Sequence, residues 1–532
     1  MAAIGKRDAH AEVGMVTSGS RLASEAGLAM LKKGGNAVDA AVATALALGV
    51  TAPAFSGVGG GGFMHIYIAK TRRSYIIDYR ESAPKRATAT MFKVDANGEV
   101  IGNENSMGVK APGVPGDFAG LALALKRFGN LPLAEVAQPA VGHAKNGFTV
   151  TPLLGRIFQT NIDDALAKFR ATPEAGRLML KPNGTPYAEG ERLVQGELGE
   201  TIERVSKNGT AEFYEGFVAD SLERHMKANG GPLRKDDLVA YKPVMRRPVV
   251  GSYKGYKLVS MPPPSSGGIA LIQLLKLFEG LDLKTKGHNS LETIDLMAKA
   301  LGRVYKAREL VADPDFTEVD ARKLTSATFI KGLRSEAYGS AKAGAKRDGS
   351  QTTHLSVVDK DHNVVALTES LECFFGSGIV VPGTGVFLND TMHDFDPVPR
   401  RINSIQPGKR PKSSMSPTIF FKDGEPVLVL GSAAGPRIIT AVLQVALNVL
   451  EHGMDVQSAI AAPRFHHQGG KLIRLETRIS EKVQQDLKAR GYEISPEGDM
   501  NYVFGGVHAI TLQDGALHGG ADPRRDGAAV GY

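Results

Sequence analysis

Two adjacent threonines and a histidine, at residues 352–354, open a run of alternating apolar residues in the last third of the chain. A threonine hydroxyl is a poor nucleophile near neutral pH, but a free α-amino group on the same residue can act as its general base. That chemistry requires the peptide bond before Thr352 to be cut. Residues 344–351 are mostly polar and contain glycine, which predicts an exposed loop that could be severed without loss of core. The same triplet also suits an ordinary strand start, because threonine favours extended backbone.

Six segments, in the same order along the chain, resemble the gamma-glutamyltranspeptidases (glutathione hydrolases), a family of self-cleaving N-terminal-nucleophile hydrolases. The segments are residues 34–43, 59–64, 78–81, 352–354, 409–418 and 462–468. The resemblance implies an α+β fold, a four-layer αββα sandwich. It also implies cleavage into a large subunit, residues 1–351, and a small subunit, residues 352–532, which stay together as one intertwined heterodimer. Whether heterodimers pair further is left open.

The resemblance also implies a mechanism without cofactor or metal. Thr352, freed by cleavage after Gln351, attacks the carbonyl of a small gamma-glutamyl amide, and water or an amino acid or dipeptide acceptor resolves the acyl-enzyme. The backbone N–H groups of Ala434 and Gly435 are expected to hold the oxyanion. The family has glycine at position 434, but the donor is main chain, so we expect the change to be tolerated. Ser370, where the family has threonine, keeps a hydroxyl near the nucleophile.

Substrate recognition follows from the resemblance in the same way. Arg80 matches the arginine that binds the α-carboxylate of the substrate, a task suited to the fork of donors on a guanidinium. Ser413 and Ser414 match the serines that assist it. Asp394 matches the acid that pairs with the α-ammonium.

Two neighbouring positions depart from the family pattern. Thr391 stands where the family has Glu or Gln, and Glu372 stands where it has Asn. Glu372 puts a second carboxylate beside Asp394, which could bind a cation more strongly or raise the pKa of one acid by repulsion. The preferred acyl group is therefore left open.

The segment of residues 396–408 is too short to hold the lid loop of many family members. The chain therefore also resembles the lidless branch, which includes poly-gamma-glutamate depolymerases and cephalosporin acylases. The leading hypothesis is a gamma-glutamyl hydrolase in which hydrolysis is favoured over transfer. The alternatives are an acylase for another amide, such as a glutaryl side chain, and an inactive, uncleaved binding protein.

Composition excludes several other classes of protein. The net charge is +8, but no block of Lys and Arg interleaved with aromatic residues predicts nucleic-acid binding. The single cysteine excludes an intramolecular disulfide. No apolar run reaches the length of a membrane span, and the first residues lack the pattern of a secretory signal. We expect a periplasmic or secreted protein if a signal was removed, and a cytoplasmic one otherwise.

Apolar periodicity locates the elements that would position these residues. It predicts helices over residues 21–33, 40–50, 118–128, 131–147, 269–278, 438–450 and 480–490. It predicts strands over residues 63–69, 74–79, 258–261, 353–358, 364–370, 418–421 and 427–430. Asn36 is the expected N-cap of the second helix, and Arg80 is expected at a strand end.

Two motifs resemble ligand sites and are interpreted as structural. Residues 57–62 fit the dinucleotide pattern G-x-G-x-x-G, but a strand follows where a Rossmann site needs a helix, so close backbone packing is predicted. His466 and His467 are neighbours on an extended segment and would point to opposite faces. With no second ligand pair at zinc-like spacing, no metal site is predicted there.

Overall fold

The structure is a computed structural model of one uncut chain, and it describes residues 8–160, 165–335 and 351–532. Two antiparallel seven-stranded sheets form its centre. The first sheet carries the predicted nucleophile, and its strands in spatial order are β21 (Ala528–Gly531), β2 (Met15–Ser18), β10 (Gln351–Val358), β11 (Val364–Glu372), β3 (Gly61–Ile68), β4 (Arg73–Asp78) and β7 (Val244–Arg246).

The second sheet packs against the first, with contacts of β19 and β15 to β10 and of β15 to β11. Its strands in spatial order are β1 (Ala9–Ala11), β20 (Ala516–Ala521), β19 (His508–Gln513), β15 (Glu425–Gly431), β14 (Thr418–Lys422), β9 (Tyr256–Ser260) and β8 (Val249–Tyr253). A small apolar cluster that includes Tyr67, Val358, Ile419 and Phe421 lies between the sheets.

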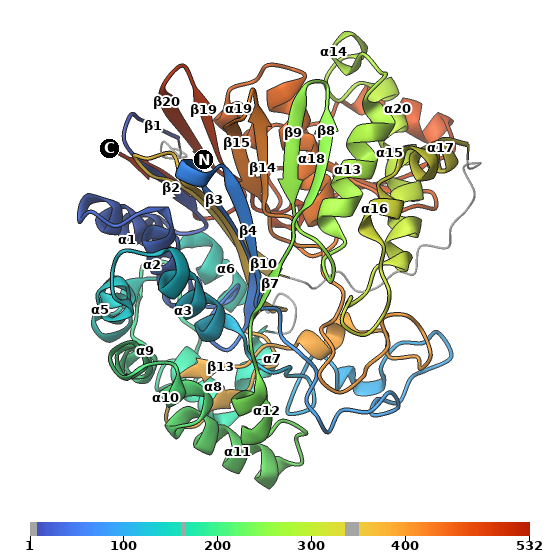
Figure 1. The fold of residues 1–532 in the computed structure, drawn as a ribbon. Helices are drawn as coiled ribbons and strands as arrows, with labels where there is room; N and C mark the ends of the chain where they lie inside the picture. The colour runs from blue at the N-terminus through green and yellow to red at the C-terminus, as the bar shows by residue number, and fades with distance from the viewer. Residues whose placement is uncertain (1–7, 161–164, 336–350) are drawn as a thin grey trace.

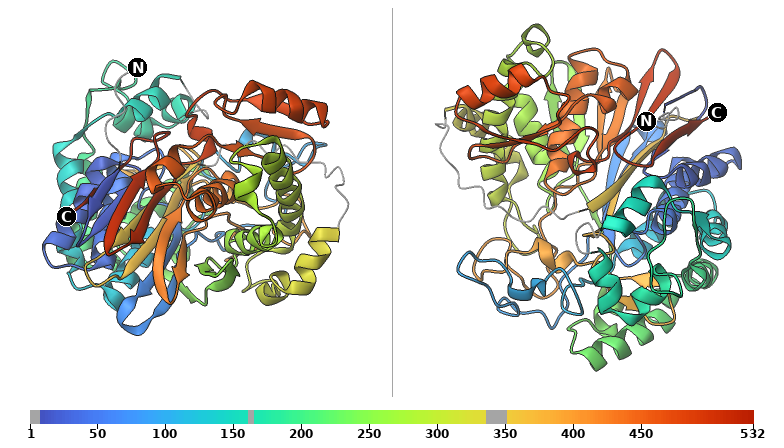
Figure 2. Two further views of the ribbon diagram at one scale, coloured as in Figure 1. Left: turned by 90° about the horizontal axis from the view of Figure 1, so that it is seen from above. Right: turned by 180° about the vertical axis from the view of Figure 1, so that it is seen from behind.

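Helices cover the outer face of each sheet, which completes four layers (Figures 1 and 2). The layer on the first sheet holds α1 (Arg21–Lys32), α2 (Ala37–Thr51), α3 (Asp117–Phe128), α4 (Leu133–Val136), α5 (Gln138–Asn146) and α9 (Gly196–Asn208). The layer on the second sheet holds α13 (Gly267–Phe278), α15 (Leu291–Ala307), α17 (Ala327–Ser335), α18 (Arg437–Leu450), α19 (Val456–Ala461) and α20 (Glu481–Ala489). The predicted αββα sandwich is confirmed.

Further elements lie outside the two sheets and the helices that cover them. The helices are α6 (Pro152–Thr160), α7 (Ala165–Ala171), α8 (Pro173–Met179), α10 (Ala211–Tyr214), α11 (Phe217–Asn229), α12 (Lys235–Ala240), α14 (Leu283–Lys286) and α16 (Ala321–Leu324). The strands are β5 (Phe148–Thr149), β6 (Arg192–Leu193), β12 (Val380–Val381), β13 (Val386–Phe387), β16 (Phe465–His466), β17 (Leu472–Leu475) and β18 (Glu493–Pro496). Single 3₁₀ turns are η1 (Ala69–Thr71), η2 (Ile101–Asn103), η4 (Arg308–Leu310), η5 (Thr391–Asp394) and η6 (Tyr502–Phe504). No helix in the described part of the chain is long and apolar enough to cross a bilayer.

The local signals that predicted the N-terminal helices work as expected. The Asn36 side chain accepts hydrogen bonds from the backbone N–H groups of Val38 and Asp39, and the Asp39 carboxylate accepts from the Asn36 N–H, which makes a capping box. Every residue of α2 is buried, as its mostly apolar sequence indicates.

One predicted helix is wrong. The expected helix over residues 131–147 is divided into α4 and α5. Pro139 is the reason, because it has no N–H to donate to the preceding turn and is tolerated only in the first turn of a helix. In the structure it occupies that first turn in α5.

Candidate active site

Thr352 is the second residue of β10 and is buried between the two sheets. In the pairing of β10 with β11, Gln351 lies opposite Glu372 and Thr353 lies opposite Glu369, so two steps on β10 face three on β11. The extra residue bulges β11 opposite Thr352, which re-aims the side chains there. Gln351 was expected in an exposed loop, and that expectation is wrong, because Gln351 is only 2% exposed and belongs to β10. Residues 344–350 lie outside the described residues.

Ser370 connects the hydroxyl of Thr352 to the carbonyl of the bond that would be cut. Its Oγ donates to the Gln351 carbonyl oxygen at 2.5 Å and accepts from the Glu372 N–H at 2.8 Å. The Thr352 hydroxyl donates more weakly to the same Oγ, at 3.4 Å. Because two donors point at the Ser370 oxygen, its own hydrogen is directed to Gln351, where it polarises the carbonyl. Gln351 and Thr352 lie on β10 and Ser370 lies on β11. We use the name cleavage pair for these two paired strand segments and the three residues that they carry.

The glycine cluster before β3 allows the chain to pass close behind the cleavage pair. A Cβ atom on Gly60 would lie 2.2 Å from the Ser370 carbonyl oxygen, and one on Gly59 would lie 1.9 Å from that of Phe387. Side chains at these positions would collide with backbone, so the predicted packing role is confirmed.

The turn between β15 and α18 holds Ala434 and Gly435. Both residues have positive φ, 82° and 50° respectively. Among the described residues, neither N–H has a hydrogen-bond acceptor, so both are available to an oxyanion. Ala433 lines the same small cavity as Thr352, which places the turn close to that threonine. An alanine costs strain at this φ where glycine would not, so the substitution is tolerated at a price in stability.

His354 fixes β10 against the strand that leads into this turn. Its ring donates or accepts at both nitrogens, with Thr368 Oγ1 at 2.8 Å and Ser356 Oγ at 3.0 Å. A Cβ on Gly431, the last residue of β15, would lie 2.3 Å from the ring, so the imidazole packs directly on the backbone. Burial holds the pKa of His354 well below its usual value, and the neutral ring is structural.

Arg80 follows β4 and is completely buried. Its guanidinium contacts the carboxylates of Glu81 at 3.3 Å and Glu372 at 3.7 Å, and it makes a close ion pair with Asp394. Burial opposes the charged form, but the three carboxylates outweigh it and raise the pKa of Arg80. We call Arg80, Glu81, Glu372 and Asp394 the Arg80 pocket.

The Arg80 pocket has an excess of negative groups, with three carboxylates around one guanidinium. Burial raises the pKa of Glu81, which limits that excess. Thr391 is buried in η5 next to this pocket, where its side chain faces Glu81. Ligand atoms of Glu372, His393 and Asp394 lie within 4.8 Å of one another. They do not form a good metal site, because the Arg80 guanidinium already occupies both carboxylates.

Glu372 has a strained backbone, with φ of 83°. A non-glycine residue at such an angle costs about 1 kcal/mol or more and is common at functional sites. Its N–H bonds Ser370 while its side chain reaches Arg80. Glu372 therefore joins the cleavage pair to the Arg80 pocket.

Ser414 is bound to a second arginine, Arg308, and Ser413 is linked to the same arginine through Ser266, an arrangement that the sequence did not predict. Arg308 donates from Nη2 to Ser414 Oγ at 2.6 Å and from Nε to Ser266 Oγ at 2.8 Å. Ser266 Oγ donates in turn to the Ser413 carbonyl at 2.8 Å. A guanidinium can only donate, so the Ser414 hydrogen is directed elsewhere and is available to an anion. Among the described residues, neither serine contacts Arg80 directly.

Two further buried acids escaped the sequence prediction. Glu369 precedes Ser370 on β11, and Asp117 begins α3. Burial raises the pKa of Glu369 to about 8 and raises that of Asp117 well above its usual range, with Glu369 adding repulsion. Asp117 Oδ1 has no hydrogen-bond partner among the described residues.

The segment of residues 396–408 folds back on itself beside the site. The Ser404 hydroxyl donates to the Val398 carbonyl at 2.6 Å, and Arg401 pairs with Asp396 at 3.0 Å. Ile405 packs in a small apolar cluster with Phe92 and neighbouring side chains. The segment is thus held in place by its own polar contacts and by this apolar cluster.

The histidine pair is engaged by other groups of the protein. His466 contacts Thr440 Oγ1 through Nδ1 at 2.9 Å, and its Nε2 lies 2.9 Å from Gln468. His467 Nδ1 lies 2.8 Å from the Leu472 carbonyl. These contacts give both rings a structural role.

Two facing sheets with a helix layer outside each, and a threonine near the start of a central strand with a polarised carbonyl before it, define an N-terminal-nucleophile hydrolase fold. The family model described as gamma-glutamyltranspeptidase matches residues 23–532, and the chain belongs to that family. The glutathione hydrolase proenzyme of Escherichia coli (strain K12) is 40% identical over 98% of this chain and 92% of its own length. The acylase ACY 1 proenzyme of Pseudomonas sp. (strain SE83) is 38% identical over 99% of this chain and 94% of its own length.

A solved structure gives the same fold over the whole length. The cephalosporin acylase from Bacillus halodurans superposes with a TM-score of 0.87 at 28% identity. The match covers 99% of this chain and 97% of that chain.

Proposed function

We propose that this protein is a self-cleaving hydrolase of gamma-glutamyl amides such as glutathione, with Thr352 as its nucleophile. The observation that supports this best is the position of Glu372, whose N–H bonds the hydroxyl network of the cleavage pair and whose carboxylate lies in the Arg80 pocket. A gamma-glutamyl substrate has the same two parts. Its reactive carbonyl carbon is three carbon–carbon bonds away from the α-carbon, which carries the charged ammonium and carboxylate groups.

Self-cleavage is an acyl shift from nitrogen to oxygen. The Thr352 Oγ forms a bond to the carbonyl carbon of Gln351, the carbon–nitrogen bond between the two residues breaks, and the hydroxyl proton ends on the released amine. Water then hydrolyses the ester. Ser370 supports the step because it already donates to the carbonyl oxygen on which negative charge develops.

Turnover uses the same hydroxyl with the new amine of Thr352 as its base. The amine takes the hydroxyl proton, the oxygen attacks the gamma-carbonyl, and the N–H groups of Ala434 and Gly435 stabilise the oxyanion. Ser370 stays beside the nucleophile. The leaving amine takes this proton from the Thr352 ammonium as the amide bond breaks, and water then hydrolyses the acyl-enzyme and releases glutamate.

The Arg80 pocket and the serine pair bind the glutamyl head group in this proposal. Arg80, assisted by Ser413 and Ser414, takes the α-carboxylate, and Asp394 and Glu372 take the α-ammonium, with Thr391 beside them. Because the pocket has more carboxylates than cations, it favours a substrate that brings a positive charge.

The two fragments would remain associated after cleavage. The small-subunit strands β10 and β11 lie between β2 and β3 of the large subunit, and β21 of the small subunit pairs with β2. We also propose that water competes well with an amino acid or dipeptide acceptor, because residues 396–408, which are too few to form a lid loop, are held beside the site.

The second candidate is an acylase for an amide that lacks the α-ammonium, such as a glutaryl side chain. The whole-length likeness to the cephalosporin acylase from Bacillus halodurans favours it. Release of p-nitroaniline from gamma-glutamyl- and glutaryl-p-nitroanilide separates the candidates, because the substrates differ only at the α-ammonium.

We expect kcat/KM to be at least about tenfold higher for the gamma-glutamyl compound, the effect of one charge-assisted hydrogen bond. Glu372→Asn should reduce that preference, and asparagine tolerates the positive φ at this position better than most residues. A preference for the glutaryl compound would favour the acylase.

A further inference from the structure

Arg525 is a buried arginine beside the scissile bond, and the mechanism above does not use it. Its Nη2 donates to Oε1 of the Gln351 side chain at 3.1 Å. Burial lowers the pKa of Arg525 to about 10, so the guanidinium still carries its charge at neutral pH. The hydrogen bond to Gln351 is therefore charge-assisted, which makes it stronger than a bond between neutral groups.

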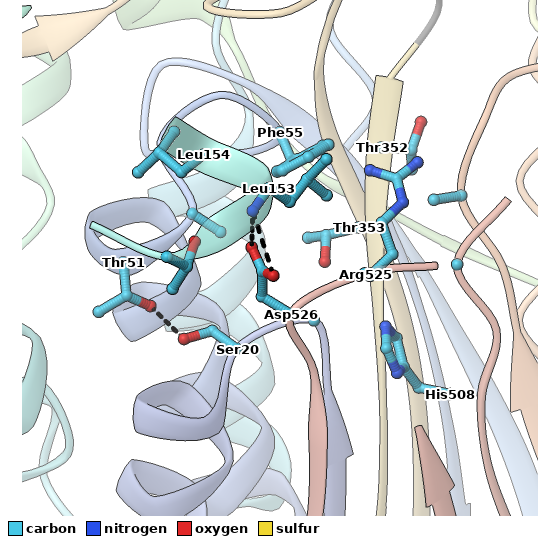
Figure 3. A pocket seen from close by; sticks show the side chains of 15 residues that line it. Ser20, Thr51, Phe55, Leu153, Leu154, Thr352, Thr353, His508, Arg525 and Asp526 are labelled. Atoms are coloured by element: carbon cyan, nitrogen blue, oxygen red, sulfur yellow. Dashed lines mark hydrogen bonds between the residues drawn. The ribbon is translucent and has the colours of Figure 1, made fainter. Parts of the chain in front are cut away.

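Aromatic rings and a glycine fix the plane of this guanidinium. Its Cζ lies 4.5 Å from the ring centroid of Phe55 and 5.9 Å from that of Tyr502. Figure 3 shows Arg525, Phe55 and Thr352 around one small cavity. A Cβ on Gly506 would lie 2.7 Å from Arg525 Cγ, so the missing side chain there makes room for the arginine.

The residues on either side of Arg525 are held by the fold. Arg524 bonds Glu476 at 2.6 and 2.8 Å and Asp522 at 3.0 Å, all buried. Asp526 accepts from the Leu153 N–H at 3.2 Å. The position of Arg525 is thus set by its own surroundings and does not depend on Gln351.

We propose that Arg525 is a positioning residue for self-cleavage, an inference that rests on the self-cleavage proposed above. Arg525 holds the side chain of Gln351 while Ser370 holds its carbonyl oxygen. Two anchors on one residue fix its rotation and present the carbonyl carbon to the Thr352 hydroxyl, and orientation of this kind accounts for large rate factors. Arg525 exchanges no proton, and the bonds made and broken are those of the acyl shift.

The test measures the rate of cleavage in pulse-labelled cell-free synthesis, resolved on denaturing gels. Gln351→Met keeps the length of the side chain and removes the acceptor, so we expect cleavage to slow about tenfold or more. Gln351→Glu keeps an acceptor for the guanidinium and should cleave within about threefold of the wild type. Cleavage of Gln351→Met at the wild-type rate would overturn the proposal.

Arg525→Gln provides a second arm, with Arg156→Gln as its matched control. Arg156 packs 5.6 Å from the same Tyr502 ring, and no hydrogen bond between it and Gln351 is found in the described structure. The control should cleave normally. The double variant Gln351→Met/Arg525→Gln should cleave no more slowly than the slower single variant, because each change removes the same contact. Effects that multiply would show that Arg525 acts independently of Gln351 and would contradict the assignment.

Failure of this inference can be distinguished from failure of the proposed function. Hydrolysis of gamma-glutamyl-p-nitroanilide per cleaved chain is measured once cleavage is complete. A protein that cleaves with the expected dependence on Gln351 but does not hydrolyse this substrate contradicts the gamma-glutamyl assignment alone. If Arg525→Gln does not fold, as judged by circular dichroism, the Gln351 variants still decide.

Discussion

The cleavage pair and the Arg80 pocket are adjacent but are built differently. The cleavage pair lies on paired strands, and its geometry comes from strand register, one bulge and hydrogen bonds at 2.5 and 2.8 Å to the Ser370 hydroxyl. The Arg80 pocket lies where strands end, and its geometry comes from four charges, all buried except the half-buried Asp394, on three segments of the chain. Backbone regularity fixes the position of the first, and balance of charge fixes that of the second. We therefore expect changes in the first to remove chemistry, and changes in the second to alter stability and specificity.

The largest effect is expected from Thr352→Ala, which removes the proposed nucleophile. Cleavage should be abolished, and hydrolysis should fall by more than about 1000-fold, as in other enzymes that lose their nucleophile. Gel electrophoresis and p-nitroaniline release measure the two effects. Thr352→Ser keeps the hydroxyl and should cleave, so an uncut but active Thr352→Ala protein would eliminate the proposed mechanism.

The next effect concerns Ser370 alone. Ser370→Ala removes the donor to the Gln351 carbonyl, and cleavage should slow by about 100-fold, the usual cost of losing one donor to a developing oxyanion. Ser370→Thr restores a hydroxyl and serves as the control. If Ser370→Ala cleaved at the wild-type rate, the hydrogen bond to Gln351 would have no part in the reaction.

In the Arg80 pocket, we expect Arg80→Gln to weaken both stability and binding. Three carboxylates would lose their counter-charge, which in buried ion pairs costs about 3–5 kcal/mol of unfolding free energy. Specificity constants for gamma-glutamyl substrates should fall by about 10- to 100-fold, because a charge-assisted contact is lost. Urea unfolding and steady-state kinetics measure the two effects. Arg80→Lys keeps the charge without the fork of donors, so its stability and its kcat/KM should lie between those of the wild type and Arg80→Gln. An unchanged kcat/KM for Arg80→Gln would remove Arg80 from the site.

The effect expected to leave activity least changed is a dependence of stability on pH through Glu369. Its pKa is raised by burial from 4.5 to about 8, so the folded state binds a proton that the unfolded state releases above its own pKa. The stabilising effect of this proton is complete below about pH 4.5 and is lost as pH rises through about 8. Tm should therefore fall between pH 5 and 9. Glu369→Gln should flatten that fall, and a Tm profile identical to that of the wild type would show that Glu369 does not titrate in this range.

The same difference between the two regions explains how much could be predicted from the sequence. Strand and helix periodicity located β10, β11 and α2, because the spacing of apolar residues along the sequence indicates which faces of an element are buried. The start of β10 was predicted wrongly, because Gln351 was assigned to an exposed loop. Its polar side chain gives no sign in the sequence of the buried arginine that binds it. Pro139 was a local signal that could have divided the predicted helix.

The contacts of the Arg80 pocket could be predicted only in part. Resemblance identified Arg80 and Asp394, and Glu372 was suspected as a second acid. The arginines that contact Ser414 and Gln351, which are Arg308 and Arg525, lie 106 and 174 positions away from them. No periodic pattern reports a contact over such a distance, and only the folded chain brings these residues together.

Mass spectrometry of the wild-type protein, denatured during turnover of gamma-glutamyl-p-nitroanilide, tests the central claim most directly. We predict two fragments, residues 1–351 and residues 352–532, with part of the small fragment heavier by one gamma-glutamyl group on Thr352. A single uncut chain of 532 residues in a sample that hydrolyses the substrate would contradict the account.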